Sequence, residues 1–254
     1  MKLRIVPAHT GVKWVQLGMH AFWRQPLALA TLFFMALAAM SLVTQMPLVG
    51  APIALALLPT TTLTMMVATA EAQQGRFPTP ALLLVAFRTG QWRLRAMLTL
   101  GGMYAAGILG IMGLSTLVDG GQFALVYFGH IKLTLELAES PAFRDAMWLS
   151  LLLHLPLSLL FWHAPGLVHW HGVPPVKALF FSIVACVRNF GTFVVFGLAW
   201  MGVFLATGMV VTLLSRLLSL AIGTTAGDIV LGGAIIVLMT MLFSSVIFTF
   251  RDCF

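Results

Sequence analysis

The chain has 254 residues, of which 60% are apolar and only 8% are charged. This composition excludes an ordinary soluble domain, because so few charges could not solvate an apolar core of that size. The formal net charge is +7, but no basic run carries the interleaved aromatic residues of a nucleic-acid surface, so nucleic acid is not an expected partner.

The first predicted element is an amphipathic helix that ends at Arg24. Val12, Val15, Met19 and Phe22 recur at helical spacing, and polar residues occupy the opposite face. Tryptophans at both ends of the segment are typical of a helix that lies in the membrane interface. We therefore expect this helix to lie flat at the membrane surface.

Two later segments repeat this pattern. The second starts at Thr79, a predicted N-cap with proline after it, and carries Arg88 and Arg95 on its polar side. The third starts at Pro174-Pro175 and ends at Arg188. Each segment precedes two apolar runs of about 20 residues or more, which is enough to cross a bilayer. These six runs are 27–46, 49–70, 96–118, 146–168, 190–214 and 229–250.

The sequence thus predicts an all-α membrane protein with about six transmembrane helices. They form three helical hairpins, each preceded by an amphipathic interfacial helix on the cytoplasmic side. Residues 119–145 are expected to form an outer loop with a helical stretch near Gln122–Glu139. We expect one integral membrane domain over 1–254.

The recurrence suggests internal repeats over 9–73, 76–170 and 173–254. The alternative is that interfacial helices simply often precede spans.

The basic residues predict the orientation of the chain, because lysine and arginine favour cytoplasmic loops. Of the 14, only Lys132, Arg144 and Arg216 fall on the other side of the six-span arrangement. Both termini are therefore expected in the cytoplasm. We expect contact with anionic lipid headgroups from a set of basic residues beside the helix ends: Arg24, Arg88, Arg93, Arg95, Lys177 and Arg188.

Two motifs resemble a known group of proteins. Phe161–Val168 reads FWHAPGLV and Pro174–Ser182 reads PPVKALFFS. With the KLRIVPA start at Lys2 and VDGGQF at Val118, they resemble uncharacterised six-span proteobacterial inner-membrane proteins. The resemblance covers essentially the whole chain. It implies a multi-pass protein of the bacterial inner membrane, and it brings no activity or catalytic residue.

His163, His169 and His171 are the candidate metal ligands, since imidazole binds zinc, copper, nickel and iron. No Cys, Asp or Glu in the same stretch completes a site. Trp162 and Trp170 alternate with the histidines, which favours an interfacial anchor. The metal is left unknown, and no cofactor is expected.

His154 is a candidate functional residue, because an ionisable group inside a span is costly. Pro156 follows it, and Pro59 precedes Thr60 and Thr61 in the second span. The two prolines suggest broken helices, as in transporters with midplane sites. The favoured alternative is that threonine hydroxyls satisfy the backbone groups that proline frees or bond across helices.

Glycines in the third and fifth predicted spans are expected to mark close helix approach. The two cysteines, Cys186 and Cys253, are expected to be unpaired thiols on the reducing side.

No catalytic triad, carboxylate pair or phosphate-binding loop can be read from the sequence. We therefore expect a non-enzymatic inner-membrane helper, scaffold or lipid-interacting component. The alternative is a small transporter or permease for an apolar or amphipathic solute, and the third hypothesis is a histidine-based metal-binding membrane protein. Expected partners are the bilayer, anionic lipids at the cytoplasmic face, and a membrane protein or a second copy.

Overall fold

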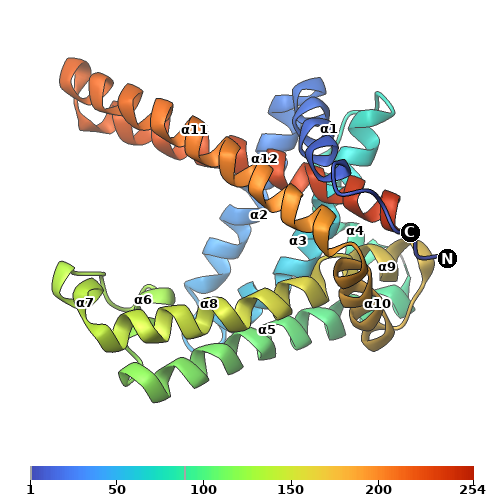
Figure 1. Ribbon diagram of the computed structural model, residues 1–254, viewed down its shortest axis with the longest axis horizontal. Coiled ribbons are helices and arrows are strands. Elements are labelled where there is room, and N and C mark those ends of the chain that lie inside the picture. The colour runs from blue at the N-terminus through green and yellow to red at the C-terminus, as the bar shows by residue number, and fades with distance from the viewer. Residues whose placement is uncertain (1, 89) are drawn as a thin grey trace. The chain divides into compact units, whose positions relative to one another are not determined.

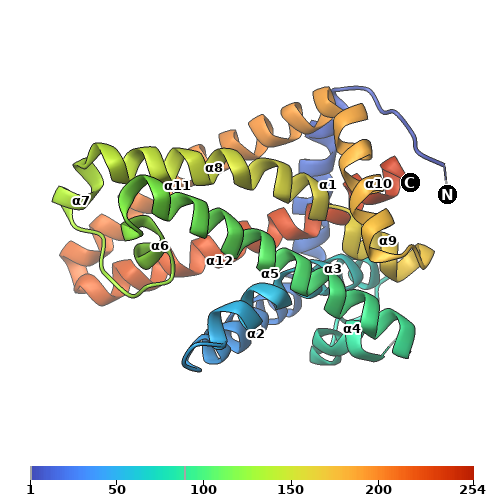
Figure 2. The same cartoon turned by 90° about the horizontal axis from the view of Figure 1, so that it is seen from below.

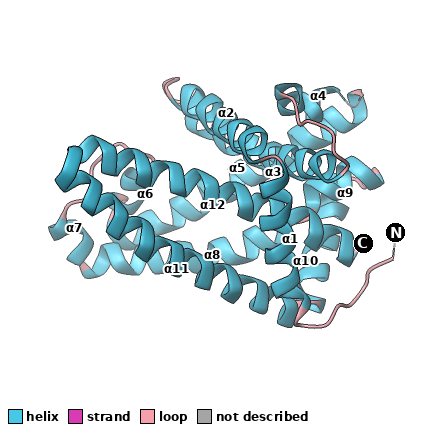
Figure 3. Cartoon of the chain, turned by 90° about the horizontal axis from the view of Figure 1, so that it is seen from above, coloured by secondary structure: helices cyan, strands magenta, loops and turns pink. Residues whose placement is uncertain are grey.

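The computed structural model describes residues 2–88 and 90–254, and every regular element in this part of the chain is a helix (Figure 3). The helices, in chain order, are α1 (Thr10–Arg24), α2 (Pro26–Thr44), α3 (Gly50–Gln73), η1 (Pro80–Leu84), α4 (Val85–Arg88), α5 (Gln91–Asp119), α6 (Gln122–Tyr127), α7 (Leu135–Glu139), α8 (Pro141–Phe161), α9 (Ala164–His171), α10 (Pro175–Arg188), α11 (Phe190–Ile222) and α12 (Thr224–Cys253).

Six segments are long and apolar enough to cross a membrane: α2, α3, α5, α8 together with α9, α11 and α12. Each pair of spans follows a shorter helical segment, namely α1, η1 with α4, or α10. The expected all-α membrane fold with six spans is therefore confirmed. The spans are mostly longer than predicted, because polar residues at their ends continue the helices.

The second amphipathic segment differs from its prediction. Thr79 occupies the N-cap position without a side-chain capping bond, and a five-residue 3₁₀ helix follows before α4. The chain then breaks at Gly90, which has a φ of 97°. Arg93 and Arg95 consequently belong to the first turns of α5, not to the amphipathic segment.

The prediction of broken helices at Pro59 and Pro156 is wrong. α3 continues through Pro59 and α8 continues through Pro156. Proline removes one hydrogen-bond donor, but neighbouring polar side chains and small backbone adjustments can satisfy the freed carbonyl in a span. The actual interruption lies further along, at Trp162 and His163, between α8 and α9.

The chain divides into two compact units. The first comprises Met1–Ala38, Thr61–Val85 and Val184–Phe254. In it α11 and α12 run side by side, and the single residue Gly223 connects them in the chain. α1 packs against both helices (Figure 1).

Two glycines of α1 permit the close approach of this helix to its neighbours. A Cβ atom on Gly11 would collide with the backbone of Thr192, and one on Gly18 would collide with Ser245. The glycines that allow this contact are therefore in α1, outside the two spans where glycine-mediated approach was expected.

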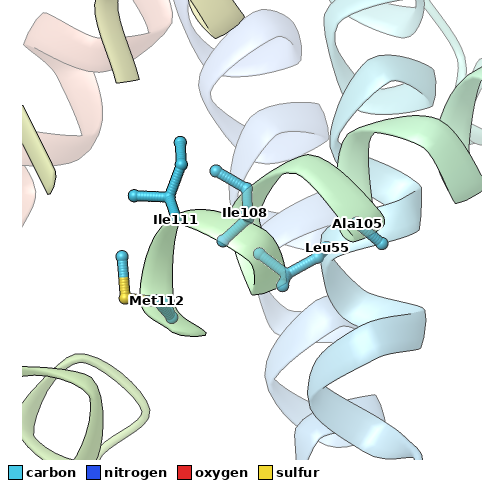
Figure 4. Close-up of a cluster of buried hydrophobic side chains, with 5 residues drawn as sticks. All are labelled: Leu55, Ala105, Ile108, Ile111 and Met112. Atoms are coloured by element: carbon cyan, nitrogen blue, oxygen red, sulfur yellow. The ribbon is translucent and has the colours of Figure 1, made fainter. Parts of the chain in front are cut away.

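The second unit comprises Ala39–Thr60 and Ala86–Ile183. Here α5 and α8 lie side by side, with α6 and α7 against one end of the pair (Figure 2). Leu55 of α3 packs against a row of buried residues on α5 (Figure 4): Ala105, Ile108, Ile111 and Met112.

Glycines of α5 confirm part of the expected close packing. A Cβ on Gly101 would collide with the carbonyl oxygen of Ala56, and one on Gly107 would collide with Leu157. Other glycines of the third and fifth spans meet no described atom within 4 Å of such a Cβ: Gly102, Gly110, Gly113, Gly197, Gly202 and Gly208. The internal triplication stays a prediction.

Candidate functional site

The three candidate metal-binding histidines do not come together on an extended loop. His169 and His171 lie on α9, and His163 occupies its N-cap position. Residues two apart on a helix point in widely different directions, so the His-x-His pair is not placed to share one ion. Within residues 2–88 and 90–254, no group of three or more His, Cys, Asp or Glu side chains is placed to hold a metal.

His163 has a structural setting. It is fully buried, and its backbone N–H donates to the hydroxyl of Ser182 at 2.9 Å. That hydroxyl in turn donates to the carbonyl of Leu159 at 2.8 Å. Ser182 therefore joins α8, the start of α9 and α10, across the interruption that follows Phe161.

His154 and Pro156 lie on α8, where His154 is half-buried and Pro156 is exposed. The ring of Pro156 removes one donor from the ladder of a helix that nevertheless continues to Phe161. A role for either residue in proton transfer or substrate contact stays a prediction.

The threonine-rich stretch after Pro59 lies in the most buried of the spans. Thr60 and Thr61 are buried. Further along, the Thr64 hydroxyl donates to the carbonyl of Leu82 at 3.2 Å. Thr64 therefore joins α3 to η1, and a functional role for Thr60 and Thr61 stays a prediction.

The basic residues expected to meet lipid headgroups lie at the ends of helices. Arg24 ends α1, Arg88 ends α4 and Arg188 ends α10. These three, with Arg95 and Lys177, are exposed. The exception is half-buried Arg93 on the first turn of α5.

A network around Asn189 was not foreseen from the sequence. This residue, between α10 and α11, is 2% exposed. Its side-chain oxygen accepts from the N–H of Val6 at 2.8 Å, and its amide nitrogen donates to the carbonyl of Arg4 at 3.1 Å. The N–H of Arg4 donates to the carbonyl of Cys253 at 2.9 Å. The segment at Arg4–Val6 is thus held to Asn189 and to the end of α12.

Trp14 makes a second unforeseen link between α1 and the C-terminal helix. It is fully buried, and its indole N–H donates to a carboxylate oxygen of Asp252 at 2.7 Å. Its ring packs against Phe193 and Phe196 of α11 at centroid distances of 5.4 and 6.0 Å. Tryptophan suits this place because it combines a large apolar surface with one donor.

Gln73, on the last turn of α3, connects two arginines from opposite ends of the chain. Its backbone carbonyl accepts from Arg24 at 2.8 Å, and its side-chain oxygen accepts from Arg251 at 2.9 Å. Next to this junction, the Gln25 amide donates to the carbonyl of Arg76 at 3.1 Å. Two guanidinium groups that the sequence separates widely therefore converge on one residue.

The two cysteines, both within the described residues, are buried and are not joined in a disulfide. Burial raises the pKa of the Cys186 thiol, and interaction with the neighbouring Cys253 thiol raises it further. A protonated, buried thiol is a poor nucleophile and a poor metal ligand, so Cys186 serves as a packing residue.

The chain is similar to a probable inner membrane protein of Burkholderia thailandensis. The two are 39% identical over 258 residues, which cover 100% of this chain and 94% of the relative. No family model matches the chain. No solved structure matches it.

Proposed function

We propose that this chain, which belongs to the same family of inner-membrane proteins as the Burkholderia protein, is a non-enzymatic, lipid-interacting scaffold. Its helices make it a multi-pass protein of the inner membrane. The proposal is that its basic face binds the anionic cytoplasmic leaflet and that both termini lie in the cytoplasm.

The observation that carries this proposal is the setting of α1. One face of this helix is buried against α11 and α12, with Trp14 and Phe22 at most 2% exposed. The other face exposes Lys13, Arg24 and the ring of Trp23, which is 66% exposed. A fixed helix with cationic and aromatic groups on its free face suits a layer of anionic headgroups.

A scaffold also agrees with the way the ends of the chain are joined. The contacts of Asn189 and Trp14 tie the N-terminal segment and α1 to the end of α12. Two helices joined in this way resist sliding past one another, which favours a fixed platform over a moving gate.

The experiment compares thermal unfolding in nanodiscs of phosphatidylglycerol and of phosphatidylcholine, at low and at high salt. We expect a higher midpoint in phosphatidylglycerol and a smaller difference at high salt, since salt screens exposed charges. Equal midpoints at low salt would contradict the proposal. A reporter fused after Phe254 should read as cytoplasmic, and a periplasmic reading would contradict the proposed orientation.

The second candidate function is a permease for an apolar or amphipathic solute. The observation that favours it is the presence of Pro59 and Pro156 inside two span helices, because each removes a ladder bond where a helix could bend. Solute uptake by proteoliposomes that is abolished when both prolines are replaced by alanine would support a permease. Uptake that is unchanged by the replacement would count against these prolines as gating points.

The third candidate is a metal protein that uses His163, His169 and His171. The separated directions of these side chains on and before α9 do not favour it. Elemental analysis of the purified protein tests it directly, because stoichiometric bound metal that is lost on replacing His169 would support it.

A further inference from the structure

An apolar crevice lies beside the first turns of α2, within the first unit. Its floor is formed by Ala28 and Leu32, which are 9% and 2% exposed. Its rim is formed by Leu27 and Phe77, which are 83% and 66% exposed. We call this feature the α2 crevice. Its apolar walls and open rim make it a surface that favours a hydrocarbon over water.

The dimensions of the α2 crevice favour an extended ligand. Its volume is about 170 Å³, whereas pockets for compact small molecules usually hold about 300–1,000 Å³. From Leu27 to Met35 the axis of α2 advances about 12 Å, at about 1.5 Å per residue. A flexible chain that lies along the helix fits this shape, because part of the chain can stay outside the crevice in the bilayer.

Three arginines are close to the residues of the α2 crevice in the chain or are joined to them through Gln73. Arg24 comes just before Leu27 in the chain, and Arg76 directly precedes Phe77. Arg251 meets Arg24 at Gln73. We call Arg24, Arg76 and Arg251 the arginine cluster. Arg24 and Arg76 are therefore within three residues of Leu27 and Phe77 along the chain, and Arg251 is joined to Arg24 through its hydrogen bond to Gln73.

The arginine cluster keeps an excess of positive charge. Two acidic residues lie on the same elements, Glu71 on α3 and Asp252 on α12. Asp252 accepts the indole bond of Trp14, so its carboxylate is directed to another partner. Each guanidinium has five donors. Arg24 and Arg251 each donate one bond to Gln73, and Arg76 donates one to the side chain of Gln74. The remaining donors suit a phosphate group.

We propose that one anionic glycerophospholipid occupies this place, with an acyl chain in the α2 crevice and its phosphate on the arginine cluster. The inference rests on the proposed function and names the lipid class and the site. An apolar groove near a group of arginines matches the two parts of such a lipid, because basic groups beside membrane helices bind anionic headgroups.

The experiment uses native mass spectrometry of the full-length protein in a mild detergent, titrated with dioleoyl phosphatidylglycerol or dioleoyl phosphatidylcholine. We expect the wild type to bind one phosphatidylglycerol more tightly than phosphatidylcholine. Arg24→Gln and Arg251→Gln should each weaken that binding about fivefold, since one cation near the surface contributes about that factor. Arg144→Gln is the matched control, because Arg144 is an exposed arginine of α8 that does not belong to the residues expected to contact headgroups, and it should leave the binding unchanged.

A second pair of variants tests the crevice separately from the charge. Thr31 is an exposed crevice residue, so Thr31→Phe should fill the space, weaken phosphatidylglycerol binding and leave the fold intact. Thr212→Phe, at an exposed position of α11, should have no effect. The inference is overturned if Thr31→Phe binds like wild type, or if both arginine variants do.

These outcomes also separate the site from the proposed function. A wild type that prefers phosphatidylglycerol, with a preference that none of the crevice or arginine variants reduces, overturns the site alone. A wild type without any preference for phosphatidylglycerol overturns both the site and the lipid-binding scaffold. Thermal unfolding of each variant shows whether a loss of binding reflects a loss of fold.

Discussion

Replacing Asn189 by alanine should release the N-terminal segment from the rest of the first unit. The substitution removes two hydrogen bonds to that segment, one from Val6 and one to Arg4. Each contributes about 1 kcal/mol net, so the segment loses about 2 kcal/mol of local stability. Since about 1.4 kcal/mol is a factor of ten, local opening should become about 30-fold more frequent.

Hydrogen exchange measured residue by residue is the assay, because it reports local opening. The amide of Arg4 is the decisive probe, since its own acceptor is the carbonyl of Cys253 and stays in place in the variant. The amide of Val6 will exchange faster in any case, because it loses its acceptor. We expect exchange of the Arg4 amide to accelerate about 30-fold.

The matched control is Thr192→Val, which removes one bond to the same segment, from the Thr192 hydroxyl to the carbonyl of Val6 at 3.0 Å. The Arg4 amide should then exchange about fivefold faster, as expected for one bond of about 1 kcal/mol. If Asn189→Ala speeds exchange at Val6 but leaves Arg4 at its wild-type rate, the network does not hold the segment and the reasoning is refuted.

Three further predictions test other parts of the fold. Trp14→Phe should lower the free energy of unfolding by about 1.5–3 kcal/mol, because it leaves the half-buried Asp252 carboxylate without its indole donor; an unchanged denaturant midpoint would contradict this. Gly101→Val should prevent folding through collision with the Ala56 carbonyl, whereas Gly110→Ala, at an open position, should be tolerated; equal yields of folded protein would contradict the assigned packing. Cys186 should resist alkylation at pH 8 until the protein is denatured, because its raised pKa keeps the buried thiol protonated; rapid labelling of native protein would contradict its burial.

The spans could be predicted because their signal is local. An apolar run of sufficient length must cross a membrane as a helix, whatever packs against it. The periodicity of residues 12–24 likewise predicted α1. Pro59 and Pro156 were misread for a related reason: proline is a strong local breaker in water, and its effect in a span depends on neighbouring groups that local rules do not contain.

The residues that join the first unit could not be predicted in this way. Asn189 and Arg4 are 185 positions apart, and a single asparagine between two apolar helices carries no periodic signal. The glycines show the same limit. In the sequence, Gly101 and Gly110 are the same residue type. Only the packed structure shows that a Cβ on Gly101 would meet Ala56, whereas one on Gly110 would have no described atom within 4 Å.

The bond between Arg4 and Cys253 has a consequence for biosynthesis. Arg4 forms a hydrogen bond with Cys253. The packing of the first unit therefore cannot be completed until the ribosome has synthesised Cys253. α1 ends at Arg24 and α12 ends at Cys253, so at about 5–20 residues per second α1 waits roughly 11 to 46 seconds for the end of α12. During that time the face that carries Trp14 has no helix to cover it, and the bilayer interface is where such a surface can be sheltered. The order of synthesis thus favours binding of α1 to the membrane surface until α12 has been made.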